Sequence, residues 1–261
     1  MNNIQSKNIS IGGLDVHYYT AGSGEPLVVI HGGGGDASTW LNNIDVLSKN
    51  YTVFAPDLPG YGGSQPLDGS YYIPELATFV DNFSDSLGLD NFHLVGHSLG
   101  GGISLNYALE FPHKIKKLVL VSSLCLGREI ALWVRLLSIP ALLRSIGYIV
   151  ISVLNGIKWI VKTMMAPMEF IIPLSPASVL IGGSVTSLKE QTLVLANRLS
   201  EIVMPTLLVW GAKDPIVPVQ HAYAAAQVIP DCRLEVFENR GHNVHRDEVQ
   251  KFSSVLNGFL G

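Results

Sequence analysis

The sequence predicts an α/β protein with a mostly parallel central sheet flanked by helices. Short, largely apolar runs are typical of strands buried on both faces of a parallel sheet, and helical patterns separate most of these runs. The predicted strands of this sheet are Leu27–Ile30, Thr52–Ala55, Phe92–Val95, Leu118–Val121, Thr206–Trp210 and Arg233–Phe237. With 261 residues, of which 48% are hydrophobic, the chain can form one large α/β domain or two small ones.

Composition argues against several classes of protein. The net charge is −4 and no run of Lys or Arg occurs, so we expect no nucleic-acid partner. The two cysteines, Cys125 and Cys232, form no CxxC pair, which argues against a disulfide framework and against a thiolate zinc site. The first residues lack the apolar segment of a secretory signal, and we therefore expect a cytoplasmic protein.

The chain opens with a predicted hairpin, Ile9–Ile11 and Val16–Tyr19, and the strand Leu27–Ile30 then leads into His31 and four glycines. A glycine run could cradle a phosphate, but this one lacks the Lys-Ser/Thr of a P-loop and the order of a dinucleotide site. Its other use is to present backbone N–H groups to an oxyanion. His31 is a candidate base, although a bracing role in the loop is favoured.

The strand Thr52–Ala55 precedes a loop rich in Gly and Pro, residues 56–64, which contains Asp57. Asp57 is a candidate catalytic acid, and a structural role in this loop is favoured. A helix is predicted to begin at Pro74-Glu75 and to end at Gly88, because apolar residues recur on one face.

The most informative stretch is Phe92–Phe111, a strand, a tight turn and a helix that ends before Pro112. The turn reads Gly96-His97-Ser98-Leu99-Gly100, a G-x-S-x-G sequence. A strand that turns directly into a helix holds its central residue in a strained conformation and leaves no room for side chains two residues away. Ser98 is therefore the candidate nucleophile, and the N–H of Leu99 points into the same space from the helix N-terminus.

The pattern changes at about Leu126, and no strand rhythm appears until about Ser200. This segment is apolar, contains Trp133 and Trp159, and is divided by four prolines. Basic residues outnumber acidic ones in it, whereas the rest of the chain is acidic. The uncharged run 145–157 is too short to span a bilayer, and 170–188 holds prolines and glycines. We predict a helical lid at 126–200 that could touch a lipid surface, on a core formed by 1–125 and 201–261.

Strand rhythm returns at Pro205. Asp214 follows the strand Thr206–Trp210, at the sheet edge where such folds place their chemistry, although an Asp before Pro is also common in turns. A helix is predicted at Val219–Val228. His242 follows the last strand, and His245 is a competitor at the start of the final helix, which runs to about Leu260.

The order Ser98, Asp214, His242 is that of a nucleophile, acid and base triad. With these residues in this order, the chain resembles the α/β-hydrolase superfamily, in the branch with a helical cap inserted after the sixth strand. The resemblance covers nearly the whole chain. It rests on the oxyanion loop His31-Gly32-Gly33, the D-x-P-G-x-G-x-S loop 57–64, the elbow 96–100, the acid loop 211–214 and the base loop Gly241-His242. One departure is the stretch 243–247, where many members carry a Pro-rich, acidic sequence.

The resemblance implies acyl transfer without a metal or cofactor. Ser98 attacks a carbonyl, His242 takes its proton, Asp214 orients the imidazole, and the N–H groups of Leu99 and Gly33 bind the oxyanion. We place Gly34, Trp133, Trp159 and Val217 at the substrate pocket.

Three functions remain open at this point. The first is a carboxylesterase or lipase-like enzyme acting on a small apolar ester, which the composition of the lid supports. The second is a C–C bond hydrolase acting on ring-fission diketones. The third is a ligand-binding member of the fold with little turnover, against which an intact triad argues.

Overall fold

A computed structural model describes residues 4–68, 71–135, 187 and 189–261. Within these residues eight strands form one sheet, in the order β1-β2-β4-β3-β5-β6-β7-β8. The strands β1 (Gln5–Ile11) and β2 (Leu14–Ala21) form the predicted hairpin, and β2 pairs antiparallel with β4 (Tyr51–Pro56). Every other pair is parallel, which confirms the mostly parallel sheet; the remaining strands are β3 (Glu25–Ile30), β5 (Phe92–His97), β6 (Ile115–Val121), β7 (Thr206–Gly211) and β8 (Cys232–Phe237).

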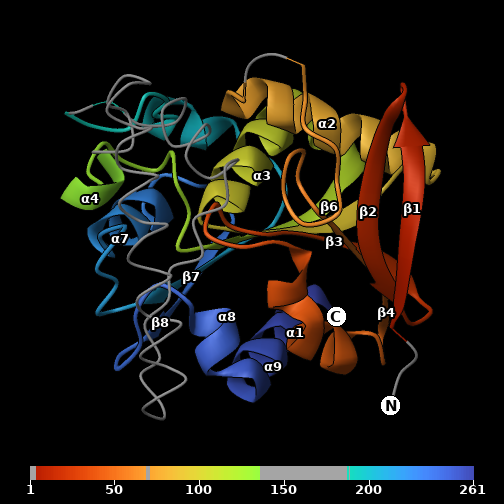
Figure 1. Ribbon diagram of the computed structural model, residues 1–261. Coiled ribbons are helices and arrows are strands. Elements are labelled where there is room, and N and C mark those ends of the chain that lie inside the picture. The colour runs from red at the N-terminus through yellow and green to blue at the C-terminus, as the bar shows by residue number, and fades with distance from the viewer. Residues whose placement is uncertain (1–3, 69–70, 136–186, 188) are drawn as a thin grey trace, which may run out of the picture.

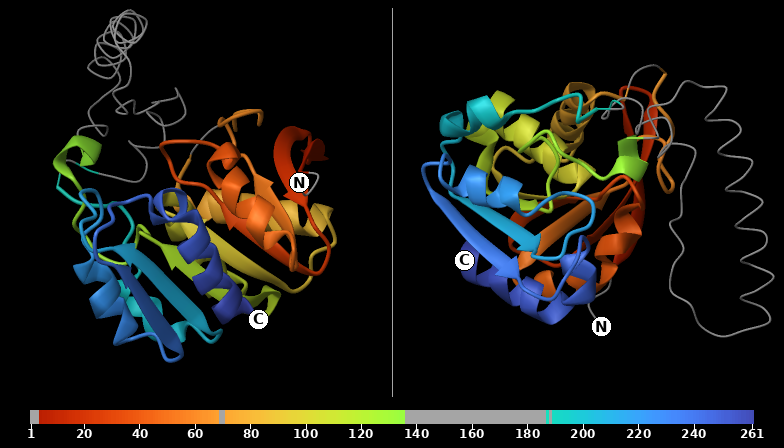
Figure 2. Two further views of the ribbon diagram at one scale, coloured as in Figure 1. Left: turned by 90° about the horizontal axis from the view of Figure 1, so that it is seen from below. Right: turned by 90° about the vertical axis from the view of Figure 1, so that its left-hand side faces the viewer.

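Helices cover both faces of the sheet (Figure 1). One face carries α2 (Ile73–Ser86) and α3 (Leu99–Glu110), and the other carries α1 (Leu41–Leu47) and α9 (Val249–Leu260), which lie side by side (Figure 2). Each face has its own cluster of buried side chains, because the apolar strands present side chains to both sides. We call them the α2/α3 core and the α1/α9 core.

The chain also forms several short helices in the segments between the strands and helices named above. They are η1 (Ala37–Trp40), η2 (Pro112–Lys114), α4 (Leu132–Arg135), η4 (Ala196–Glu201), α7 (Gln220–Ala226) and α8 (Val244–Asp247). Within the described residues, no helix combines the length and the hydrophobicity that a bilayer-spanning segment requires.

The strand order reverses at β3, which has β4 on one side and β5 on the other. The last residue of β3, Ile30, is in register with Gly96 near the end of β5. The loop that begins at His31 and the turn that holds Ser98 therefore leave the sheet beside each other. Parallel sheets bind their ligands at such a reversal, outside the carboxyl ends of the strands.

Two helical details differ from the sequence-based expectation. Helix α1 was not predicted, because Asn42 and Asn43 are weak helix formers; the amide of Asn43 is buried and donates to the backbone of α8. The sequence predicted His245 at the start of the final helix. In the structure it lies in the short helix α8, which is separate from the final helix α9.

Most of the predicted lid, 126–200, falls outside the described residues. The two ends that the structure does describe lie together: the N–H of Leu195 donates to the carbonyl of Cys125 at 2.8 Å, and the amide of Gln191 bonds Cys125 and Glu129. Leu126, Ile130, Leu195 and Leu199 belong to the α2/α3 core. The division into core and lid stays a prediction.

His245 is buried beside the α1/α9 core, with 1% of its surface exposed. Its ring packs on Trp40, with 4.4 Å between ring centroids, and on Phe252. Neither ring nitrogen has a hydrogen-bond partner among the described residues. Burial lowers the pKa of His245 well below its usual 6.5, so the folded protein holds this ring neutral.

This burial predicts a dependence of stability on pH. Below pH 6.5 the unfolded chain binds a proton at His245 that the folded chain does not, so the free energy of unfolding falls as the pH decreases. One such proton contributes about 1.4 kcal/mol per pH unit. We expect His245→Phe, which keeps a ring and removes the proton site, to flatten the slope by this amount in urea denaturation between about pH 6 and pH 5.

At neutral pH this variant should be no less stable than the wild type, because it removes two unpartnered buried nitrogens. His113→Gln, at an exposed histidine, is the control and should leave the slope unchanged. An unaltered slope in His245→Phe would contradict the prediction.

Candidate functional site

Ser98 lies between two elements, since β5 ends at His97 and α3 begins at Leu99. Its backbone has φ 54° and ψ −114°, a region that non-glycine residues rarely adopt. A Cβ on Gly96 would overlap the carbonyl oxygen of Gly100, which is why this turn requires glycine there. The half-buried Ser98 side chain therefore stands at the tip of the strand, as the G-x-S-x-G spacing predicts.

Asp214 and His242 come together from the loops after β7 and β8. The Nδ1 of His242 donates to Oδ2 of Asp214 at 2.8 Å, and the two side chains are 8% and 0% exposed. The other carboxylate oxygen accepts the N–H groups of Ile216 and Val217, at 2.8 and 3.0 Å. Burial by itself would raise the pKa of Asp214, but the bonds from His242 and the backbone outweigh it and lower that pKa. Asp214 is thus held ionised beside His242.

The base loop is attached to the elbow through His97, the residue before Ser98. His97 Nε2 donates to the carbonyl oxygen of His242 at 3.0 Å. Burial, together with the neighbouring His242, lowers the pKa of His97 to about 3, so its ring is neutral at physiological pH. Asp214, His242 and Ser98 therefore lie in one region at the carboxyl ends of β5, β7 and β8.

The predicted oxyanion donors also lie together. A Cβ on Gly33 would be 3.7 Å from the Leu99 Cβ and 3.5 Å from its Cδ2, so the glycine loop runs beside the start of α3. As the first residue of α3, Leu99 has an N–H without an acceptor in the helix itself. The carbonyl of Gly33 accepts a hydrogen bond from the Tyr61 hydroxyl at 3.3 Å, which holds the loop in place.

Four residues were predicted to line the substrate pocket, and the structure describes them to different extents. Gly34 is exposed at the tip of the glycine loop. Val217 has no exposed surface; its N–H donates to Asp214, its carbonyl accepts from the Trp210 indole, and its place at the substrate pocket stays a prediction. Trp133 lies in α4, and its side chain is not among those described. Trp159 lies outside the described residues.

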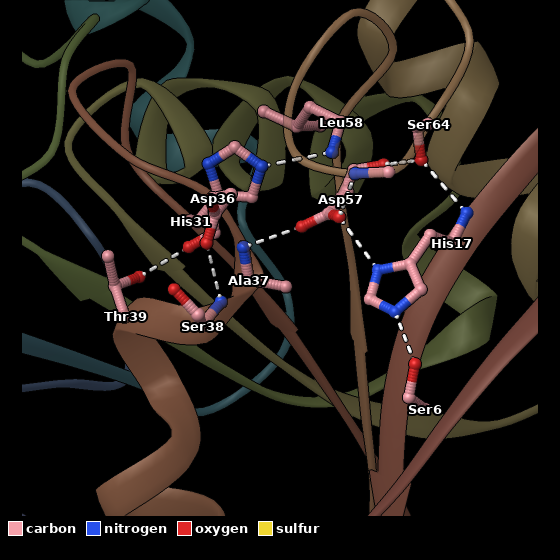
Figure 3. A network of polar contacts seen from close by, with 11 residues as sticks. Ser6, His17, His31, Asp36, Ala37, Ser38, Thr39, Asp57, Leu58 and Ser64 are labelled. Atoms are coloured by element: carbon pink, nitrogen blue, oxygen red, sulfur yellow. Dashed lines mark hydrogen bonds and ion pairs between the residues drawn. The ribbon is translucent and has the colours of Figure 1, made fainter. Parts of the chain in front are cut away.

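His31 and Asp57 form hydrogen bonds that hold the loops at the edge of this region in place (Figure 3). The buried His31 ring donates from Nδ1 to the carbonyl of Gly32 and accepts the N–H of Leu58 at Nε2, in agreement with a bracing role. Asp57 accepts the N–H groups of Ala37 and Gly63 and bonds His17 at 2.7 Å. Among the described residues, no hydrogen bond joins either of them to His242 or Ser98.

Two residues of this region were not singled out in the sequence. His17 bonds Asp57. The feature of the sequence that could have indicated this role is the position of a polar residue within the largely apolar strand Val16–Tyr19. His97 ties the elbow to the base loop, and its signal was a second polar residue in the strand of the elbow. No group of three or more side chains suited to bind a metal ion gathers among the described residues.

The Asp57 contacts predict a large effect on stability. Asp57→Ala leaves the N–H groups of Ala37 and Gly63 and the ring of His17 without their acceptor in a site where Asp57 is 2% exposed. We expect a loss of about 3 kcal/mol in the free energy of unfolding, measured by urea denaturation. Asp90→Ala, at an exposed carboxylate, should change it little. If Asp57→Ala is as stable as the Asp90 variant, the bracing role is wrong.

The sequence model of the α/β-hydrolase fold matches residues 25–140 and 171–249. The chain is 31% identical over 256 residues to the dihydrolipoyllysine-residue acetyltransferase component of the acetoin cleaving system of Cupriavidus necator, across 96% of this chain and 68% of that protein. It is 28% identical to the 2-hydroxy-6-oxo-2,4-heptadienoate hydrolase of Pseudomonas putida, across 95% of this chain and 94% of that protein.

Among solved structures, a bacterial membrane phospholipase A superposes with a TM-score of 0.81 at 25% identity, across 98% of this chain and 86% of that one. The fold and these relatives support a hydrolase of the α/β fold. The family model matches well over half of the sequence, which leads to one conclusion. The chain belongs to the α/β-hydrolase family.

Proposed function

We propose that the protein is a serine hydrolase that cleaves carboxylic esters with an apolar acyl or alcohol part through an acyl-enzyme. The observation that carries this proposal is the buried Asp214–His242 pair, held by His97 next to the strained Ser98. The hydrogen-bond pattern fixes the His242 tautomer: Nδ1 carries the proton bonded to Asp214, and Nε2 is left as the acceptor that a base requires.

The proposed mechanism has two steps. In the first, Ser98 Oγ attacks the ester carbonyl, its proton passes to His242 Nε2, and the alcohol leaves with that proton. In the second, water attacks the acyl-enzyme with His242 again as base. The N–H groups of Leu99 and Gly33 are the proposed oxyanion donors, and one such donor contributes about 3 kcal/mol to the transition state.

A second candidate uses the same three residues. The Pseudomonas putida relative is named as a hydrolase of 2-hydroxy-6-oxo-2,4-heptadienoate, and this chain covers 94% of it. A C–C bond hydrolase acting on ring-fission diketones is therefore the alternative reaction. We prefer the ester hydrolase because residues 126–200 are apolar in composition. We propose that these residues form a lid over the acyl group and contact a lipid surface.

The nucleophile can be tested directly. Ser98→Ala should lower kcat on the order of 10⁶-fold, and a fluorophosphonate probe should label the wild type at Ser98 and leave the variant unlabelled. Ser122→Ala is a matched control, since Ser122 also follows a strand and also has positive φ, 45°. It should retain turnover and labelling. Wild-type turnover in Ser98→Ala would refute the proposed mechanism.

The substrate class is tested with p-nitrophenyl esters of increasing acyl length. Each buried methylene should add up to about 0.8 kcal/mol of binding, so kcat/KM should rise from acetate until the pocket is filled. A flat profile together with turnover of a ring-fission diketone would favour the C–C hydrolase. Tight binding of either compound with negligible turnover would favour a ligand-binding protein.

A further inference from the structure

Four aromatic rings pack one against the next from the α1/α9 core to the proposed base, each pair tilted rather than stacked. Trp40 packs on His245 with 4.4 Å between ring centroids, His245 packs on His97 at 4.3 Å, and His97 packs on His242 at 4.8 Å. We call Trp40, His245, His97 and His242 the ring column. All four side chains are buried, and the column brings residues from η1, α8, β5 and the loop after β8 into contact.

His97 is the member of the column that makes a polar contact with the base. A carbonyl oxygen only accepts, so the 3.0 Å contact with the His242 carbonyl places the proton of His97 on Nε2. The ring is neutral at physiological pH, with a pKa of about 3, and it therefore remains a single donor. Its Nδ1 faces Gly32, where an added Cβ would lie 2.8 Å away, so the ring has little room to turn.

His242 is consequently held at two points. Asp214 fixes its imidazole through Nδ1, and His97 fixes its backbone carbonyl while it covers part of the ring. The first contact sets the tautomer and orientation of the ring. The second sets where the loop after β8 lies relative to the elbow, because His97 is covalently joined to Ser98.

We propose that His97 is a positioning residue, which holds the backbone of His242 in register with Ser98 through its Nε2–H. This inference rests on the proposed function, in which His242 is the base. Displacement of a catalytic group by about 1 Å costs on the order of a hundredfold in rate. A residue that only filled the core would affect stability and leave the rate of the folded enzyme unchanged.

The experiment separates the donor from the ring. His97→Phe keeps a ring and loses the donor, whereas His97→Gln loses the ring and can place an amide N–H near the position of Nε2. We expect His97→Phe to lower kcat on the order of a hundredfold, with KM within about twofold of the wild type. His97→Gln should recover most of that loss. If His97→Phe does not fold, His97→Asn replaces it, since its shorter amide does not reach the His242 carbonyl.

His93→Phe is the matched control. His93 lies on the same strand as His97, is 2% exposed and bonds Glu25 at 3.0 Å, at the end of β5 away from Ser98. Its replacement should leave kcat unchanged at a temperature where all variants are folded. Wild-type kcat in His97→Phe, or equal losses in His97→Phe and His97→Gln, would overturn the proposal.

A readout that needs no turnover keeps the inference separate from the proposed function. The His242 Nδ1 proton, bonded to Asp214, should give a resolved low-field signal in proton NMR spectra of the wild type, His93→Phe and His97→Gln. In His97→Phe it should be broadened by exchange with water. If Ser98→Ala retains turnover, the hydrolase mechanism fails and this signal still decides the positioning role; an unaffected signal in His97→Phe overturns it.

Discussion

The site depends on a backbone conformation at Ser98 that is unfavourable by itself. A non-glycine residue in such a region costs about 1–3 kcal/mol and persists only where its surroundings determine it. Here the N–H of Ser98 donates to Val121 in β6 at 2.9 Å, and its carbonyl accepts from Gly102 in α3 and from Leu124 after β6. Hydrogen bonds with β6, with α3 and with the segment after β6 therefore fix the peptide groups on both sides of Ser98. The position of its hydroxyl follows from the sheet and helix and does not require a mobile loop.

The order of the strands explains how loops that are far apart in the sequence meet at the site. At the reversal around β3, the glycine loop and the elbow leave adjacent strands, while the acid and base loops leave β7 and β8. Since β6 and β7 separate β5 from β8, the base must reach across two strands to meet Ser98. The ring column and the His97 bond span that gap. His97 thus contributes to the geometry although it precedes the residue that reacts.

The protein uses the same chemical pair twice, in two places. Asp57 bonds His17 at 2.7 Å and Asp214 bonds His242 at 2.8 Å, with both carboxylates also accepting two backbone N–H groups. The His17–Asp57 pair lies at the antiparallel side of the sheet, where its other ring nitrogen contacts the exposed Ser6. The His242–Asp214 pair lies at the carboxyl ends of parallel strands. Location in the sheet, rather than the pair itself, separates a brace from a candidate catalytic dyad.

The sequence alone determined the α/β class, the strands of the parallel sheet and the candidates Ser98, Asp214 and His242, because these depend on local spacing: apolar runs of strand length, and glycines at fixed distances from a serine. It left Asp57 and Asp214 as rival acids and did not identify α1, His17 or His97 as structural parts. Only the tertiary structure decided which aspartate meets which histidine, since those pairs join residues 40 and 28 positions apart through the order of the strands. It also decided the neutral state of His97 and His245, because burial acts on a side chain only once the chain is packed around it.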